Sequence, residues 1–309
     1  TAMGGYTQAS GDYSTAMGVS TTASGIYSTA MGGYTQASGD YSTAMGRSTT
    51  ASGSYSTAMG YSSTASGLNS TAMGYSSTAS GSLTTAMGYS STASGNYSTA
   101  MGYQTTASGS RTTAMGYQTT ASGTGSTAMG LGTTASDFAS LVIGQYNSSG
   151  SSATSADSFS TSNTAFVIGN GADSSNKSDA FKVLFNGDAT VSNDLTVSGD
   201  VVISSDARLK SNIVSLGSTL PKLLQIDGKS YEMKGKQKIG VLAQEIQEVF
   251  PELVSEDDNE MLAVNYQGLV PVLINALKEQ DAKLNEQETK YMEQEQRLER
   301  LERLVANMD

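Results

Sequence analysis

Few residues of this chain could carry out covalent chemistry. Cys and His are both absent from its 309 residues, which removes thiolate nucleophiles and the commonest general base and metal ligand. A hydroxyl nucleophile would need a lysine as its base, and a lysine serves as a base only where burial or a nearby cation lowers its pKa. Residues 1–204 contain no pair of carboxylates spaced for glycoside hydrolysis. Most enzyme classes are therefore excluded, and we expect no metal and no cofactor.

One hexapeptide, Ser205-Asp206-Ala207-Arg208-Leu209-Lys210, combines a serine, a lysine and an intervening cation. Side chains alternate along a strand, so a separation of five residues does not put Ser205 and Lys210 on one face. A bend or a neighbouring chain would have to bring the two together. The alternative interpretation is a turn serine and a surface lysine.

This hexapeptide extends a six-residue repeat that occupies 187–204. Each copy has a Gly or Asn followed by Asp, then apolar residues at its third and fifth positions. The apolar pairs are Ala189 and Val191, Leu195 and Val197, and Val201 and Ile203. We expect each copy to be a short strand after a turn. Such strands make no core alone, whereas three chains could form a β-prism-like neck.

A second repeat, of 14 residues, fills the N-terminal half. Its Thr-Ala-Met-Gly element begins at Thr1 and recurs without insertion up to 127, and Leu141–Gly144 is a degenerate copy. An Ala-Ser-Gly element follows half a period later. Fourteen residues suit two short strands and two tight turns at the glycines. The sequence therefore predicts a repetitive β-structure over 1–144.

Alternation along the strands predicts which side chains face inward. Ala2 and Ala9 would fill a thin interior, while Met3 and its equivalents would form an outward apolar ladder. One chain cannot cover such a ladder, so we expect partner chains around a three-fold axis. The alternative is that methionine fills the interior of the coil itself.

Tyrosines recur in the turns that we expect to be exposed. The first column is Tyr13, Tyr27, Tyr41, Tyr55 and Tyr97, and the second is Tyr61, Tyr75, Tyr89, Tyr103 and Tyr117. They are candidate ligand-facing residues for a cell-surface glycan or another surface ligand. The alternative is packing between neighbouring coils or chains.

A heptad pattern runs through 270–309. Its a positions are Val270, Leu277, Leu284, Tyr291, Leu298 and Val305, and its d positions are Leu273, Gln280, Gln287, Gln294, Leu301 and Met308. Basic residues at g are followed five residues later by acidic residues at e, as in pairs between parallel chains. The pattern favours a parallel trimeric coiled coil, with a helix folded back on its own module as the alternative.

Two family resemblances follow from these motifs. The 14-residue repeat of 1–144 resembles the YadA-like head of trimeric adhesins, which implies a left-handed parallel β-roll. The hexapeptide 205–210, with Ile239–Val254 and Val264–Ile274, resembles the endosialidase-type intramolecular chaperone of phage tail spikes and fibres and of bacterial mosaic adhesins. That resemblance covers 205–309. It implies a module that promotes trimerisation and then cuts itself off.

The second resemblance implies roles for individual residues. Ser205 would be the nucleophile and Lys210 its partner, in a single-turnover serine autoprotease that cuts between Ser204 and Ser205. Asp206 and Arg208 complete the signature, and Arg208 could also lower the lysine pKa. The chain runs through the expected cut with both residues of the dyad unmutated. Whether this member of the family cleaves itself is therefore left open.

Together these expectations describe a mainly β homotrimer. Its parts would be the β-roll (1–144), an adaptor (145–186), the hexad repeats (187–204), a small α+β chaperone module (205–269) and the coiled coil (270–309). The net charge of −11 and the lack of a basic patch argue against nucleic-acid binding. No apolar run is long enough to span a membrane. The chain begins within a repeat, so we expect it to be part of a longer protein.

We therefore expect an extracellular fibre, on a bacterial surface or a phage virion, that attaches to surfaces. The alternative is an ice-binding threonine-rich solenoid. Bulky tyrosine turns beside the threonines would disturb the flat surface that ice binding requires. A measurement of thermal hysteresis separates the two.

Overall fold

The structure is a computed structural model that describes residues 1–256 and 260–307. The chain is mainly β and divides into two units, Thr1–Asp200 and Val201–Asp309. Met308, the last expected d position, lies outside the described residues.

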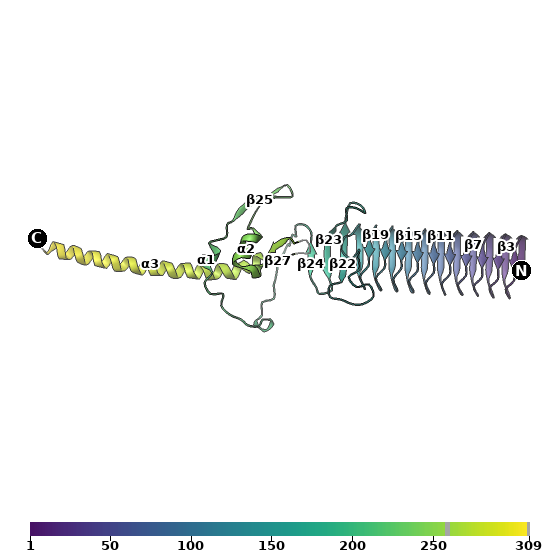
Figure 1. Cartoon of the computed structure of the whole chain (residues 1–309), viewed down its shortest axis with the longest axis horizontal. Coiled ribbons are helices and arrows are strands. Elements are labelled where there is room, and N and C mark those ends of the chain that lie inside the picture. The colour runs from purple at the N-terminus through teal and green to yellow at the C-terminus, as the bar shows by residue number, and fades with distance from the viewer. Residues whose placement is uncertain (257–259, 308–309) are drawn as a thin grey trace. The chain divides into compact units, whose positions relative to one another are not determined.

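The first unit begins with a β-solenoid of about ten turns, which Figure 1 shows as a row of stacked strands. Each turn has one longer and one two-residue strand. The longer strands are β1 (Ala2–Gly5), β3 (Thr15–Val19), β5 (Thr29–Gly33), β7 (Thr43–Arg47), β9 (Thr57–Tyr61), β11 (Thr71–Tyr75), β13 (Thr85–Tyr89), β15 (Thr99–Tyr103), β17 (Thr113–Tyr117) and β19 (Thr127–Leu131). The short strands are β2 (Gln8–Ala9), β4 (Thr22–Ala23), β6 (Gln36–Ala37), β8 (Thr50–Ala51), β10 (Thr64–Ala65), β12 (Thr78–Ala79), β14 (Thr92–Ala93), β16 (Thr106–Ala107), β18 (Thr120–Ala121) and β20 (Thr134–Ala135).

The 14-residue period sets the register of the solenoid. Each strand pairs in parallel with the strand one period away, so Met73 lies opposite Met59 and Met87. The degenerate copy forms β21 (Leu141–Gln145), and β22 (Thr164–Asn170) adds one more parallel strand, with Gly169 opposite Gly144. The predicted repetitive β-structure is therefore confirmed, and its longer sheet continues past residue 144.

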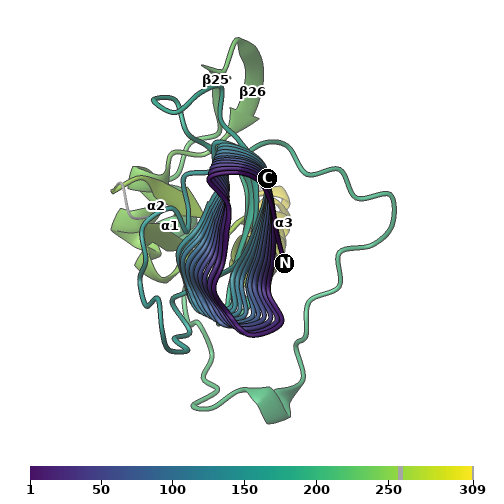
Figure 2. The ribbon, with the colours of Figure 1, turned by 90° about the vertical axis from the view of Figure 1, so that its right-hand side faces the viewer.

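The interior of the solenoid is filled by small side chains. Ala16 and Ala23 are fully buried, as are their equivalents in later turns, together with Ser and Thr side chains such as Thr21 and Ser28. Figure 2 looks along the stack, where the turns superimpose as one narrow coil. The methionines lie on the outer face, where Met17 is 37% exposed. The alternative in which methionine fills the interior is therefore wrong, because the buried positions of the 14-residue repeat hold Ala, Ser and Thr side chains.

A buried aspartate closes the C-terminal end of the solenoid. Asp137 takes the place of the glycine in the Ala-Ser-Gly element and is fully buried. Its carboxylate accepts hydrogen bonds from the backbone N–H groups of Thr154 and Thr164, at 2.6 and 2.8 Å. These bonds tie the irregular chain after β21 to the last turns. Asp137 thus marks where the repeat ends.

The hexad repeat forms a strand only in its first copy. In that copy β24 (Ala189–Val191) pairs antiparallel with β23 (Asp179–Leu184), which pairs with β22. Residues 193–204 form no strand, and Leu195, Val201 and Ile203 are at least 60% exposed. The expected strands in the second and third copies are therefore missing from the single chain. Such short strands are stable only beside neighbours that pair with them.

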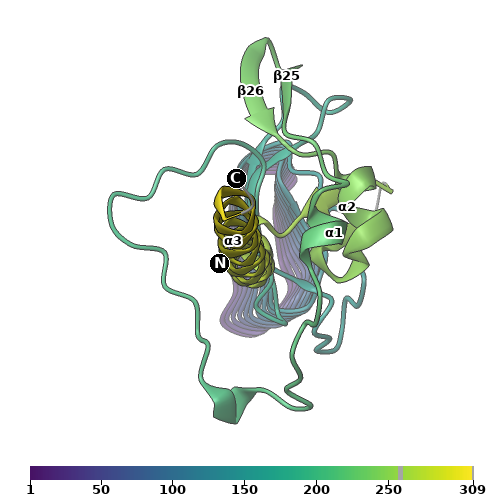
Figure 3. The same ribbon diagram turned by 90° about the vertical axis from the view of Figure 1, so that its left-hand side faces the viewer.

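The second unit is a small α+β module with a long helix. Its elements are the 3₁₀ turn η1 (Ala207–Leu209), α1 (Leu220–Leu223), the hairpin of β25 (Lys229–Met233) and β26 (Lys236–Gly240), α2 (Ala243–Val249), η2 (Pro251–Leu253), the pair β27 (Val254–Glu256) and β28 (Leu262–Val264), η3 (Tyr266–Gly268) and α3 (Leu269–Ala306). Figure 3 looks along α3 and shows the β25–β26 hairpin projecting from the module. Within the described ranges, no helix has the length and apolar character needed to cross a membrane.

Helix α3 has two distinct apolar faces. Pro271 lies in its first turn, where proline costs no internal hydrogen bond. Val272 and Ala276 are buried, and Val272 packs into the module core with Ile246 and Phe250. The residues at a and d are exposed instead, from Leu273 at 51% and Leu277 at 71% to Leu298 at 58%. The start of the helix therefore packs on its own module, while the heptad seam from Leu277 onward does not.

Candidate functional site

A 3₁₀ turn brings Ser205 and Lys210 together in one chain. The Lys210 ammonium donates a hydrogen bond to Ser205 Oγ at 2.7 Å. Between them lies η1, whose N-cap Asp206 accepts the backbone N–H of Arg208 at 2.9 Å. The required bend is therefore present without a neighbouring chain. The distance lies within the range in which a base can take a proton from a hydroxyl.

Arg208 is turned toward Asp206 and forms an ion pair of 2.6 Å with it. Hydrogen bonding from the Arg208 side chain lowers the pKa of Asp206, and the same contact raises the pKa of Arg208. The guanidinium charge is thus largely offset by a carboxylate. The sequence allowed an action of Arg208 on the lysine as one role; in the single chain Arg208 contacts Asp206 and holds the turn.

The whole turn is open to solvent. Ser204, Ser205 and Lys210 are exposed, as is the chain on either side of them. Exposure leaves the dyad without the desolvation that lysine bases use. A single chain therefore places the two groups within hydrogen-bond distance but does not bury them.

A glutamate of α3 fastens the segment that follows the turn. The Glu279 carboxylate accepts hydrogen bonds from the backbone N–H of Thr219 and from the Ser218 hydroxyl, the latter at 2.8 Å. These hydrogen bonds lower the pKa of Glu279. The bond from the Thr219 backbone has the larger effect, and the bond from the Ser218 side chain has the next largest. The heptad pattern did not indicate this contact, because Glu279 lies off the a and d positions.

The lowered pKa makes this contact sensitive to acid. A depressed carboxyl pKa adds stability above the unfolded pKa, and that stability is lost as pH falls through the folded pKa. We expect Glu279→Gln to lower the urea midpoint of the helical signal at pH 7. The difference from the wild type should shrink as the pH falls below about 4.3, the usual pKa of an unfolded glutamate, and should vanish only below the lowered pKa of the folded chain.

Circular dichroism at 222 nm during urea titration measures this effect. Glu293→Gln, an exposed change at the same heptad position of the same helix, is the matched control and should leave the midpoint unchanged. Equal midpoints for Glu279→Gln and the wild type at pH 7 would contradict the role of this contact.

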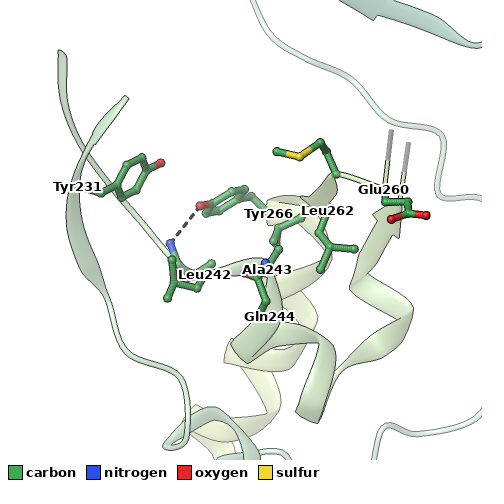
Figure 4. Close-up of a pocket in the computed structure, with 10 residues that line it drawn as sticks. Tyr231, Leu242, Ala243, Gln244, Glu260, Leu262 and Tyr266 are labelled. Carbon is green, nitrogen blue, oxygen red and sulfur yellow. Dashed lines mark hydrogen bonds between the residues drawn. The ribbon is translucent and has the colours of Figure 1, made fainter. Parts of the chain in front are cut away.

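Two cavities lie in the module, away from the Ser205 turn. One, of about 350 Å³, is lined by Tyr231, Leu242 and Tyr266 among others, and Figure 4 shows it beside the N-terminal end of α2. The Tyr266 hydroxyl accepts the backbone N–H of Val241 there. The other, of about 360 Å³, includes Leu269 and Leu273 of α3. Neither is lined by Ser205 or Lys210, so neither cavity belongs to the dyad.

The tyrosine columns are both exposed and stacked. Ring centroids in the second column, from Tyr61 to Tyr117, are 4.7–5.0 Å apart with nearly parallel planes. In the first column they are 4.7–5.2 Å apart from Tyr13 to Tyr55. The guanidinium of Arg47 lies 5.7 Å from the centroid of Tyr61. The columns therefore pack between neighbouring turns, and stacking covers most ring faces while the side chains stay 37–79% exposed.

Comparison with known proteins finds one family match in each of two parts of the chain. The YadA head domain repeat matches residues 1–21, 23–49, 51–77, 79–105 and 107–133. The chaperone of endosialidase matches residues 205–255, a shorter stretch than the 205–309 of the sequence resemblance.

Two curated relatives are tail fibre proteins. The chain is 34% identical over 96 residues to Long tail fiber protein Gp37 of Enterobacteria phage K3, and equally to that of Enterobacteria phage T2. The aligned part is 28% of this chain but 8% and 7% of those proteins, so the chain spans less than a tenth of their length. The chain thus carries YadA head repeats and an endosialidase chaperone domain, as a fibre- or adhesin-like protein related to phage tail fibres.

Proposed function

We propose that this chain is a homotrimeric extracellular fibre or adhesin whose C-terminal module starts trimerisation and then releases itself. The exposed heptad seam of α3 is the observation that carries the proposal. The module core takes up one face of the helix through Val272 and Ala276. The seam is a separate apolar stripe, and leucines at a and d are typically buried between helices.

The remaining parts of the chain fit the same assembly. The outward methionines of the solenoid form a long apolar stripe, and the apolar residues of 193–204 are exposed. We propose a left-handed trimeric roll over 1–144, an adaptor over 145–186 and a β-prism-like neck over 187–204. Three chains around one axis would cover both sets of side chains.

The proposed self-release uses the Ser205–Lys210 dyad. Ser205 Oγ attacks the carbonyl carbon of Ser204 while neutral Lys210 takes the hydroxyl proton. The C–N bond breaks, the amide nitrogen receives a proton, and water then hydrolyses the resulting ester. A neighbouring chain would supply the desolvation that the single chain lacks, which would link the cut to assembly.

The oligomeric state is the direct test of this proposal. In a Ser205→Ala background, which keeps the chain whole, we expect sedimentation equilibrium to give three times the 31.9 kDa chain mass. Replacing Leu277, Leu284 and Leu298 by Asp should give monomers, since each lost leucine contact costs about 2–5 kcal/mol.

Matched substitutions on another face of the same helix are the control. Thr289→Asp together with Gln296→Asp, at f positions, should leave the mass of the assembly unchanged. A wild-type monomer at micromolar concentration would overturn the homotrimer, and a seam variant that stays trimeric would overturn the role of the seam.

We further propose that the tyrosine columns face the ligand, through ring edges and hydroxyls. A glycan is the proposed class of ligand, bound by hydrogen bonds to the hydroxyl row and not by stacking on covered ring faces. Phe in place of Tyr75, Tyr89 and Tyr103 keeps the stack and removes three hydroxyls. We expect at least about tenfold weaker binding on a glycan array, the loss of 1.4 kcal/mol. Unchanged binding would leave the columns with a packing role alone.

A further inference from the structure

An apolar cavity lies against the core of the C-terminal module. It is the cavity of about 360 Å³ that includes Leu269 and Leu273, and none of the described residues that line it is charged. Leu223 and Ile226 line it as well, and both pack partly buried against the module core. An apolar cavity of about 150 Å³ is already large enough to bind benzene. This one therefore has room for at least one aliphatic side chain.

The chain that follows the dyad contains a short apolar segment, residues 213–216. Its three large side chains, Ile213, Val214 and Leu216, are each more than half exposed. The segment carries no charge and forms neither helix nor strand. Single exposed apolar residues are common, but a contiguous apolar patch typically marks an interface. We therefore looked for a surface that the apolar segment fits.

In the single chain the apolar segment stays outside the cavity. Among the described residues that line the cavity, none belongs to the segment, although Glu279 of α3 holds Thr219 only three residues further on. The chain turns between the two at Gly217, whose φ is +68°. This conformation leaves both the cavity and the apolar segment open to a second copy of the chain.

The heptad seam favours a second copy as the occupant. Leu273, the first d residue, lines the cavity, and the exposed seam continues from Leu277 along the same helix. In a parallel coiled coil, equivalent d residues of the chains meet at the axis. Association along the seam therefore brings the cavity of one chain next to the module of another. An exchange from each chain to the next closes after three copies.

We propose that the apolar segment of each chain docks into the cavity of the next chain, with Val214 and Leu216 as the inserted side chains. In an extended segment these two point to one side, and Ile213 and Ser215 point to the other. This inference rests on the proposed homotrimer and names the part of the neighbouring chain that covers the dyad. Val214 is four residues after Lys210, so at about 3.3 Å per residue a docked segment holds the dyad within roughly 13 Å of the cavity.

Pairs of thiols introduced into this Cys-free chain test the docking directly. One variant carries Val214→Cys with Ile226→Cys. The matched variant carries Val214→Cys with Met233→Cys, because Met233 is exposed on the hairpin and does not line the cavity. Both are made with Ser205→Ala and oxidised at micromolar concentration. A disulfide requires the two Cα atoms to come within about 7 Å. On a non-reducing gel we expect a covalent trimer, three times the 31.9 kDa chain mass, from the Ile226 pair alone.

The outcomes separate this inference from the homotrimer. A disulfide within one chain, which runs faster on the gel than the reduced chain, would overturn the exchange between chains. No disulfide in an assembly that sedimentation equilibrium finds trimeric would overturn the docking and leave the homotrimer in place. Equal linking by the two pairs would overturn the cavity as the docking site. A monomer by sedimentation would remove the homotrimer and this inference with it.

Aspartates on the two sides of the apolar segment test its link to the dyad. Val214→Asp puts a charge where the cavity would have to bury it, whereas Ser215→Asp puts the same charge on the opposite side. We expect Val214→Asp to slow the appearance of fragment 1–204 at least about tenfold, because an undocked dyad lacks the burial that favours a neutral lysine. Ser215→Asp should keep the wild-type rate, and both variants should keep the wild-type mass of the assembly. Cleavage of Val214→Asp at the wild-type rate would overturn the link between docking and the cut.

Discussion

The wild-type chain is expected to separate on a denaturing gel into 1–204 and 205–309, whereas Ser205→Ala stays whole. The reason is the contact of 2.7 Å between Ser205 Oγ and Lys210 Nζ, which places a base beside the only hydroxyl that the signature identifies as nucleophile. Lys210→Met keeps much of the side-chain length and removes the amine. We expect it to slow cleavage by at least about 10²-fold, the usual contribution of a general base.

Controls separate the dyad from its surroundings. Lys222→Met removes another exposed lysine of the module and should leave cleavage unchanged. Mass spectrometry of the fragments should place the new N-terminus at Ser205. Full-length bands of equal intensity for the wild type and Ser205→Ala would remove the protease proposal and leave the chaperone domain as a folding module.

The same gel tests the link between the cut and assembly. If neighbouring chains desolvate the dyad, the seam variant with Asp at Leu277, Leu284 and Leu298 should also cut more slowly. Cleavage of that variant at the wild-type rate would show that one chain is sufficient.

Gly74→Ala is expected to disrupt the middle of the solenoid. Gly74 has φ +115°, and a Cβ at this position would lie 2.1 Å from the carbonyl oxygen of Gly88 on the next turn. The neighbouring atom is backbone, so it cannot turn aside as a flexible side chain would. Strained φ and steric overlap together should cost about 4 kcal/mol or more.

Gly33→Ala is the matched control. Gly33 ends a longer strand of the same roll, and a Cβ there would meet nothing within 4 Å. Each turn of a solenoid is stabilised by its neighbours. A destabilised turn in the middle should therefore let the two ends of the solenoid unfold separately. Thermal unfolding followed by circular dichroism should show an early transition for Gly74→Ala alone. Equal curves for the two variants would contradict the tight stacking of the glycines.

Much of this architecture could be predicted because it repeats. A period of 14 without insertion aligns identical residues on successive turns. The alternation of side chains worked out for one repeat therefore predicts inward alanines and outward methionines in every repeat. The heptad pattern likewise predicted the helix and its apolar seam. Local patterns predict repeated elements because each copy packs against a copy like itself.

Features that occur once were decided by the tertiary structure. The role of Asp137 was not predicted, because its only sequence signal is Asp in place of Gly in the Ala-Ser-Gly element. The contact of Glu279 was not predicted either, because its partners Ser218 and Thr219 are about sixty residues away in the chain. In both cases a carboxylate satisfies backbone N–H groups from distant segments, and no spacing rule relates them.

The Ser205–Lys210 pair shows most clearly which features the sequence determines and which the folded structure determines. By itself the sequence determined which residue types were available for chemistry, because the absence of Cys and His left a hydroxyl and a lysine. It could not decide whether a bend or a second chain brings them together, since alternation on a strand places them apart. The folded chain decided for the bend, because Asp206 caps a 3₁₀ turn and holds Arg208, and that turn brings Lys210 back onto Ser205.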